Sequence, residues 1–182
     1  MDAIDDADAA QRLIEIVRGF ETAMLVAADD DDLTRARPMM IVNRRSAPLP
    51  PHRMVFLTHR RNPLLANLDD DPYVCVTLQD RTRYVCLAGR ATVDDDSLRI
   101  FSLWSREWDP WFPGGASDIN AVLIDCRMSF AELWDPTGAP SQRFALHSGK
   151  ILPLHPTVDA AAIGHRPALL TDVLTPLQAS AL

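Results

Sequence analysis

Short apolar segments separated by polar turns dominate the middle of the chain. These segments are five to twelve residues long and either alternate between apolar and polar positions or run apolar throughout. Both patterns are typical of strands in an antiparallel sheet. We predict strands at residues 22–28, 34–43, 54–58, 73–79, 82–93, 121–125 and 128–134. The pattern therefore indicates a mainly β protein.

The first apolar residues of the chain recur with helical spacing instead. Leu13, Val17 and Phe20 share one face of a predicted helix that follows a cluster of aspartates and ends near Gly19. After it, the aspartate run 29–32 separates the first two predicted strands. These two strands are therefore expected to form a hairpin.

Two shorter helices are predicted between the strands. Asn62 and Pro63 suit the cap and the first position of a helix over residues 64–68. The other helix begins after three successive aspartates at 94–96. Its inward-facing residues are expected to be Leu98, Phe101 and Trp104.

The fourth and fifth predicted strands are separated only by Asp80 and Arg81. A two-residue hairpin loop would place Cys75 directly opposite Cys86, on the same face of the sheet. We expect both thiols to be reduced, because thiols stay reduced in the cytoplasm.

The stretch 103–136 is rich in large aromatic residues. It holds all four tryptophans: Trp104, Trp108, Trp111 and Trp134. Trp111 and Phe112 precede a Pro-Gly-Gly turn, which predicts that a loop presents both rings. Either the rings cap one end of the fold, or they face a partner.

Charge and composition limit the partners and the kinds of binding site that this chain can have. A net charge of −7 argues against nucleic-acid and anionic-membrane partners. Of the 18 cationic residues only Lys150 is a lysine, so an anion site would use arginines, hydroxyls or backbone amides.

No apolar stretch approaches the length of a bilayer span, and we predict a cytoplasmic protein. The histidines at 147, 155 and 165 lack the spacing of metal ligands, so no metal site is expected.

Several motifs occur in the order found in one known family. They are Arg37-Pro38-Met39, Phe56-Leu57-Thr58, Gly89-Arg90-Ala91, the loop Trp111-Phe112-Pro113-Gly114 and the terminal Glu132-x-Trp134-Asp135. Through them the chain resembles, over residues 20–135, the general stress protein 26 branch of the pyridoxamine 5'-phosphate oxidase-like, FMN-binding split-barrel proteins. The order of the motifs carries this resemblance, because no single one is specific.

The resemblance implies a fold and an assembly. The expected fold is mainly β (α+β), an antiparallel six- or seven-stranded split β-barrel with flanking helices. Barrel and N-terminal helix would occupy residues 1–136. The proline-rich remainder, 137–182, would be an extension with short helical pieces, packed on the barrel or on a dimer partner. Because the family is dimeric, a homodimer with the cofactor site at its interface is expected.

The resemblance also implies FMN as cofactor. The expected cofactor-binding residues are those that hold the phosphate (Arg37, Thr58 and Arg61), those beside the isoalloxazine ring (Met39 and Leu57), their motif neighbours Pro38 and Phe56, and Trp111 of the other subunit. A phosphate role suits arginine, since a guanidinium offers two parallel donors to phosphate oxygens. No catalytic acid or base can be assigned.

One position departs from the family pattern. The phosphate-binding lysine of the family aligns with Leu64, which removes a positive charge from a site for a dianion. Arg60 and Arg61, in the preceding loop, are candidates to replace it. On this hypothesis a Leu64→Lys substitution would tighten FMN binding.

Two functions remain open from the sequence. The first is an FMN-binding oxidoreductase-like protein of the general stress type; it is not expected to be a true pyridoxamine phosphate oxidase, because the arginine-rich C-terminal segment of those enzymes is missing. The alternative is a non-enzymatic split barrel that has lost FMN or binds another ligand, such as a deazaflavin or heme, and acts as a sensor or interaction protein.

Overall fold

The fold is an antiparallel sheet that curls without closing. The computed structural model describes residues 3–28, 33–42, 52–135, 141–147 and 150–154. The strands are β1 (Thr22–Ala28), β2 (Thr34–Met40), β3 (Arg53–His59), β4 (Tyr73–Gln79), β5 (Tyr84–Asp94), β6 (Ala121–Trp134), β7 (Gln142–His147) and β8 (Lys150–Leu154). The helices are α1 (Ala3–Arg18), α2 (Leu64–Asn67) and α3 (Ser97–Leu103), with 3-10 turns η1 (Arg106–Trp108) and η2 (Gly115–Ser117).

The strand order is β2-β1-β4-β5-β6-β7-β8, and β3 pairs with the free side of β6. Between β2 and β3 the structure shows one isolated bridge, Ile41 to Phe56, and the bond from Val42 N to Val55 O. A curled sheet whose edge strands β2 and β3 are joined by only these few contacts is a split barrel. The predicted fold class is therefore confirmed, with eight strands in the described residues instead of six or seven.

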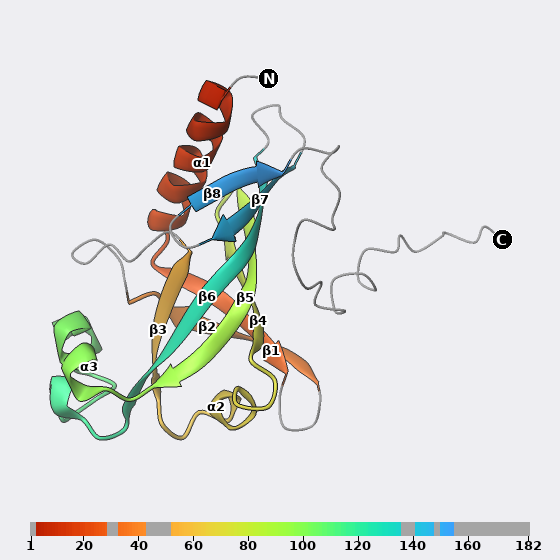
Figure 1. The fold of residues 1–182 in the computed structure, drawn as a ribbon. Helices are drawn as coiled ribbons and strands as arrows, with labels where there is room; N and C mark the ends of the chain where they lie inside the picture. The colour runs from red at the N-terminus through yellow and green to blue at the C-terminus, as the bar shows by residue number, and fades with distance from the viewer. Residues whose placement is uncertain (1–2, 29–32, 43–51, 136–140, 148–149, 155–182) are drawn as a thin grey trace.

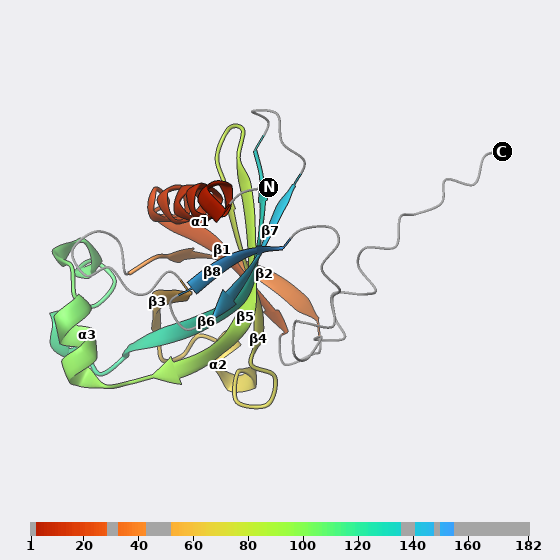
Figure 2. The ribbon, with the colours of Figure 1, turned by 45° about the horizontal axis from the view of Figure 1, so that its top comes forward.

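The long strand β6 links the parts of the barrel. Its first half pairs with β3 and its second half with β7, while β5 follows its other side. Figures 1 and 2 show β5 and β6 running together across the molecule toward α3. A bulge interrupts their register at Gly89, where an added Cβ would lie 2.1 Å from the carbonyl oxygen of Arg127. This close approach of the two backbones at the bulge requires glycine.

Two apolar clusters lie on opposite faces of the sheet. The principal core fills the barrel and includes Leu13 and Ile16 of α1, Leu25, Met54, Phe56, Val76, Leu133 and Phe144. The second core lies outside, over β3 and the start of β6; it consists of Val42, Val55, Leu57, Ile100, Trp108, Phe112, Ala121 and Leu123. Residues 53–59 of β3 are half-buried or buried throughout because both faces of that strand are covered.

The predicted N-terminal helix is confirmed, although it begins earlier than expected. It starts at Ala3, so the aspartates at 5, 6 and 8 lie in its first turns instead of preceding it. Acidic residues stabilise that end of a helix through the macrodipole. Figure 1 shows α1 at the β7–β8 end of the barrel, in contact with β8, and α2 and α3 at the other end.

The hairpin between β4 and β5 differs from the prediction. Gln79 faces Tyr84, so the loop has four residues, not two. The reason is the Asp80 side chain, which accepts hydrogen bonds from the backbone N–H groups of Thr82 and Arg83 at 3.0 and 2.8 Å. An aspartate that bonds to the backbone in this way stabilises a wider turn.

The cysteine register shifts with this loop. Cys75 faces Ala88 and Cys86 faces Thr77, so the two cysteines are diagonal neighbours instead of a directly opposed pair. They still share one face, as predicted, and their sulfur atoms lie 3.2 Å apart as free thiols.

Residues 142–154 also differ from the prediction. They form β7 and β8, which extend the sheet beyond β6, instead of the short helical pieces expected there. The rest of the C-terminal extension, from residue 155, lies outside the described residues. In the described part of the chain, every helix is too short or too polar to cross a lipid bilayer.

Candidate functional site

The Arg37-Pro38-Met39 motif lies on β2, an edge strand paired with β1. Arg37 faces Leu25 and Met39 faces Ala23, and both of these β1 residues are buried in the principal core. Because directly opposed residues share a face, Arg37 and Met39 point toward the barrel interior. Pro38 is exposed on the other face. Arg37 is half-buried on this inner face of β2, an edge strand beside the split.

Thr58 lies at the end of β3 on the same inner face as Phe56. Its hydroxyl is buried and accepts a hydrogen bond of 2.8 Å from the amide nitrogen of Asn62. The side-chain oxygen of Asn62 accepts in turn from the backbone N–H of Leu64 at 3.1 Å. Asn62 therefore joins the strand end to α2, but the cap position of this helix is Pro63, one residue later than predicted.

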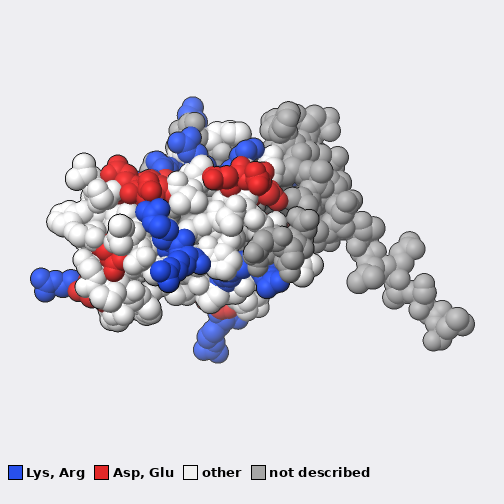
Figure 3. Space-filling view, turned by 90° about the horizontal axis from the view of Figure 1, so that it is seen from below, with Lys and Arg blue, Asp and Glu red and all other residues white. Residues whose placement is uncertain are grey.

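The two arginines that follow Thr58 behave differently. Arg60 is held by the carbonyl oxygen of Ile119 at 3.2 Å and by Asp95 at 3.3 Å. Arg61 is exposed, and its backbone N–H donates to His59 Nδ1 at 3.1 Å. Figure 3 shows that basic and acidic side chains are interspersed on this lower end of the molecule. Arg61 is therefore better able than Arg60 to replace a missing cation.

Leu64, at the position of the family lysine, is completely buried in the principal core. The phase of α2 turns this side chain away from solvent and into the barrel. A lysine here would have to bring its ammonium into an apolar core or displace the helix. The expectation that Leu64→Lys tightens FMN binding is therefore not supported by the geometry, for this physical reason.

The residues predicted to flank the ring lie on different faces. Met39 belongs to the principal core, whereas Leu57 belongs to the second core. Phe56 shares the principal core with Met39, and Leu57 directly follows Phe56 on β3. Successive strand residues point to opposite faces of a sheet, so Leu57 faces the other side. The structure thus brings Arg37, Met39, Phe56 and Thr58 to the inner face, and it places Leu57 on the side of the aromatic loop.

The aromatic loop presents one ring, not two. Trp111 is 61% exposed, whereas Phe112 is buried in the second core. Trp104 meets both Trp108 and Phe112 edge to face, with ring centroids 5.5 and 5.7 Å apart. Phe112 is therefore buried by residues of its own chain. The Asp118 carboxylate closes the loop by accepting a hydrogen bond from the backbone N–H of Gly114 at 3.0 Å. Hydrogen bonds from the backbone N–H groups of Asn120 and Gly114 lower the pKa of this carboxyl.

The helix α3 turns a different face inward than predicted. Leu98 and Phe101 are 80% and 68% exposed, and Ile100 is buried instead. Of the three residues predicted to face inward, only Trp104 does so: together with Leu103 it is half-buried against the second core. The reason is Arg99, whose ion pairs with Asp94 and Asp125 rotate the helix so that residues 99, 100 and 103 face the sheet.

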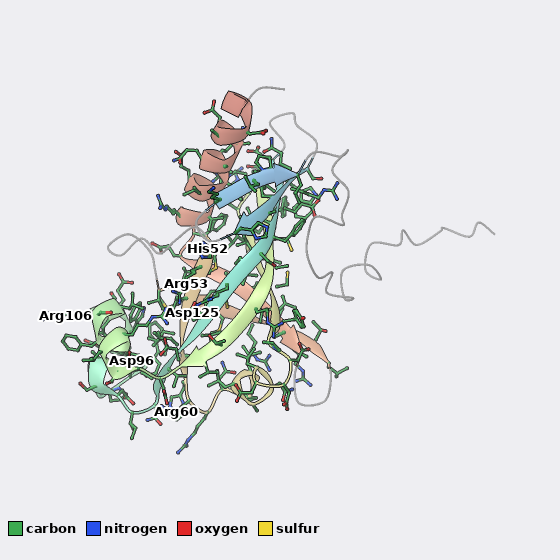
Figure 4. The ribbon with its side chains drawn as sticks, viewed as in Figure 1. His52, Arg53, Arg60, Asp96, Arg106 and Asp125 are labelled. Atoms are coloured by element: carbon green, nitrogen blue, oxygen red, sulfur yellow. The ribbon has the colours of Figure 1, made fainter. Side chains whose placement is uncertain are left out.

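A buried carboxylate lies at the centre of these ion pairs. Asp125, in the middle of β6, is 4% exposed and accepts from Arg53 Nε at 3.2 Å and from Arg53 Nη2. It also forms an ion pair with Arg99. Figure 4 shows Arg53 of β3 and Asp125 of β6 side by side. Sequence reasoning missed this group, although an aspartate inside an apolar strand was the available signal.

The fold resembles solved structures of low sequence identity. A Clostridium acetobutylicum protein related to general stress protein 26 of B. subtilis superposes with a TM-score of 0.67 at 13% identity, over 78% of this chain and 96% of that one. General stress protein 26 of Bacillus anthracis gives 0.62 at 20% identity, over 76% and 98%. A general stress FMN/FAD binding protein of Xanthomonas citri gives 0.61 at 21% identity, over 80% and 98%.

No curated protein matches the chain. The family model described as "Pyridoxamine 5'-phosphate oxidase like" matches residues 8–150. This match covers the helix α1 from residue 8 onward and the strands β1 to β7, and it includes every residue of the predicted cofactor site. The chain therefore belongs to the pyridoxamine 5'-phosphate oxidase-like family.

Proposed function

We propose that this protein binds FMN at the open edge of the barrel and is of the oxidoreductase type. Arg37, Thr58 and Arg61 would hold the phosphate. The observation that carries the proposal is the inward orientation of Arg37, which sets a guanidinium at the split beside an otherwise apolar interior. The family match and the FMN/FAD-binding description of the Xanthomonas citri relative support it.

The parts of this site lie at one end of the barrel. The helix α2 contacts β1, the strand whose Leu25 faces Arg37. Figure 1 shows α2 at the same end of the barrel as the C-terminal end of β1 and the N-terminal end of β2. The residues present suit the phosphate of FMN in kind, with two guanidiniums and a hydroxyl as donors. When bound, the flavin supplies the redox chemistry, and this chain positions it.

The first test is FMN titration of wild type and Arg37→Ala. A charge-assisted contact to phosphate contributes about 1.5–3 kcal/mol, so the variant should bind FMN about ten- to a hundredfold more weakly. Flavin fluorescence quenching measures both affinities. Arg106→Ala removes another exposed arginine, on η1, and should leave the affinity unchanged. Equal affinities for wild type and Arg37→Ala would place the phosphate elsewhere.

The alternative function rests on Leu64. Because this side chain is fully buried, the site lacks the cation that the family places there. A split barrel with a weakened phosphate site could serve as a non-enzymatic binding or sensor protein. If wild type takes up no FMN at micromolar concentration, while a deazaflavin or heme binds, this alternative replaces the first proposal.

We further propose a homodimer, located in the cytoplasm, where its three free cysteines remain reduced. The interface would include the α3 patch, which we define as the exposed side chains of Leu98, Phe101, Trp111 and Ile119. They lie on α3 and on the loops beside η2, which contacts α3. Several large exposed apolar side chains on neighbouring elements favour a partner.

Light scattering tests the assembly. The wild type should have the mass of a dimer, and Phe101→Asp should shift it toward the monomer because a charge replaces an interface ring. Leu152→Asp is the matched control, since Leu152 is 50% exposed on β8, outside the patch. A wild type that is monomeric at roughly tens of micromolar would contradict the proposal.

A further inference from the structure

Three arginines lie side by side on the outer face of the sheet. Arg127 of β6 is directly opposite Arg53 of β3 on one side and Arg90 of β5 on the other. Directly opposed residues have Cβ atoms about 4.5–5.5 Å apart, so the three side chains leave the sheet together. We refer to Arg53, Arg127 and Arg90 as the arginine row.

The row faces away from the barrel interior. Its neighbours Cys126 and Met128 belong to the principal core, so Arg127 between them points outward. Arg90 and Arg127 are exposed, and Arg53 is half-buried. The row is therefore accessible on a surface that the second core does not cover.

Two members of the row, Arg90 and Arg127, have no carboxylate partner among the described residues. Arg53 shares the carboxylate of Asp125 with Arg99. Arg90 lies over the ring of Tyr73, 4.9 Å from its centroid, and donates to the Tyr73 hydroxyl at 3.3 Å, which is a neutral partner. Arg127 has no ion pair among the described residues.

Among the described residues, Arg90 and Arg127 therefore add two positive charges that no carboxylate neutralises, whereas Arg53 is paired with Asp125. The local excess of positive charge contrasts with the net charge of −7 for the whole chain. Like charges directly opposite one another destabilise a sheet, and an anion between them relieves the repulsion.

His52 adds a polar group beside the row. Burial, with the positive charges of Arg53 and Arg127, lowers the pKa of its imidazole. Both guanidiniums therefore lie near this ring, and a neutral imidazole can still donate or accept a hydrogen bond. Figure 4 shows His52 and Arg53 adjacent at the start of β3.

We propose that the arginine row binds a small phosphate dianion. Guanidiniums match phosphate oxygens with paired donors, and long arginine side chains from neighbouring strands can converge on one phosphate group. The acidic remainder of the chain repels a polyanion.

This site is separate from the proposed flavin site. Arg53 and Thr58 are five residues apart on β3, about 17 Å, and the odd separation places them on opposite faces. Binding at the row can therefore succeed or fail independently of FMN binding.

The test is titration of the full chain with inorganic phosphate, followed by NMR of the arginine side-chain Nε–H groups. The Nε–H chemical shifts of Arg53, Arg90 and Arg127 should change as phosphate is added and reach a plateau at roughly millimolar concentration. Chloride at equal ionic strength should not produce this change. Arg127→Gln should weaken phosphate binding about tenfold and keep the fold, because its side chain is exposed. Arg106→Gln is the control and should bind as wild type does.

Three results would overturn the proposal. The first is a response to phosphate that never saturates or that chloride reproduces, since both indicate general screening. The second is an equal affinity of Arg127→Gln and Arg106→Gln. The third is competition between phosphate and FMN, which would place the phosphate in the flavin site; unchanged phosphate binding by the FMN-loaded protein supports a separate site.

Discussion

Replacing Asp125 with asparagine is expected to lower the free energy of unfolding by about 3 kcal/mol. Removing one member of a buried ion pair costs about 3–5 kcal/mol, because the other charge remains desolvated. The lower end applies here, since the side chains of Arg53 and Arg99 are 26% and 24% exposed and water can still reach them. Asparagine keeps the shape of the side chain, so the loss reports the charge.

Urea unfolding followed by tryptophan fluorescence measures this loss. The matched control is Asp95→Asn, which breaks the ion pair with Arg60, whose two side chains are 64% and 48% exposed. An exposed pair of this kind contributes less than about 1 kcal/mol. If both variants lose equally little stability, Asp125 is not the charge that fixes α3 on the sheet, and the explanation for the helix orientation is wrong.

A lysine at position 64 is expected to destabilise the protein by about 4 kcal/mol. Leu64 has no exposed surface, and removing a buried leucine side chain alone costs about 2–5 kcal/mol. The ammonium adds the cost of burying a charge, unless it loses its proton. The loss of core packing therefore outweighs any gain from a new phosphate contact when no FMN is present.

The dependence on pH identifies the buried charge. A lysine buried in the core has a lower pKa in the folded state than its ordinary value of about 10.4 in the unfolded chain. The unfolded state then binds more protons, so the stability of Leu64→Lys should rise relative to wild type as pH increases toward that value.

Two controls separate packing from surface charge. Leu64→Met conserves volume and should lose less than about 1.5 kcal/mol. Leu152→Lys places the same charge at a residue that is 50% exposed on β8, outside the α3 patch, and should change little. Wild-type stability of Leu64→Lys together with tighter FMN binding would show that the side chain leaves the core and reaches the phosphate.

Much of the local structure follows from residues close together in the sequence. Strands β1 and β4 have the predicted bounds because apolar runs end at polar turn residues. The helix α1 follows from the spacing of Leu13 and Val17, and Asn62 joins β3 to α2 through its own side chain. The family resemblance read from ordered motifs is confirmed as well.

Loop geometry was less predictable, because one side chain changed the register. A strand pattern fixes which residues share a face, and Cys75 and Cys86 do share one. It does not fix the loop length, which depends here on the hydrogen bonds that Asp80 accepts from Thr82 and Arg83. Register is therefore a property of the turn as much as of the strands.

The sequence by itself determined most of the strands and helices of the barrel and the family. Only the tertiary structure decided which of these residues meet. The burial of Leu64, the orientation of α3 and the arginine row each depend on which strands are neighbours, because β3 and β6 are more than sixty residues apart in the sequence yet pair directly. Periodicity describes one segment at a time, whereas a site is made where distant segments pack.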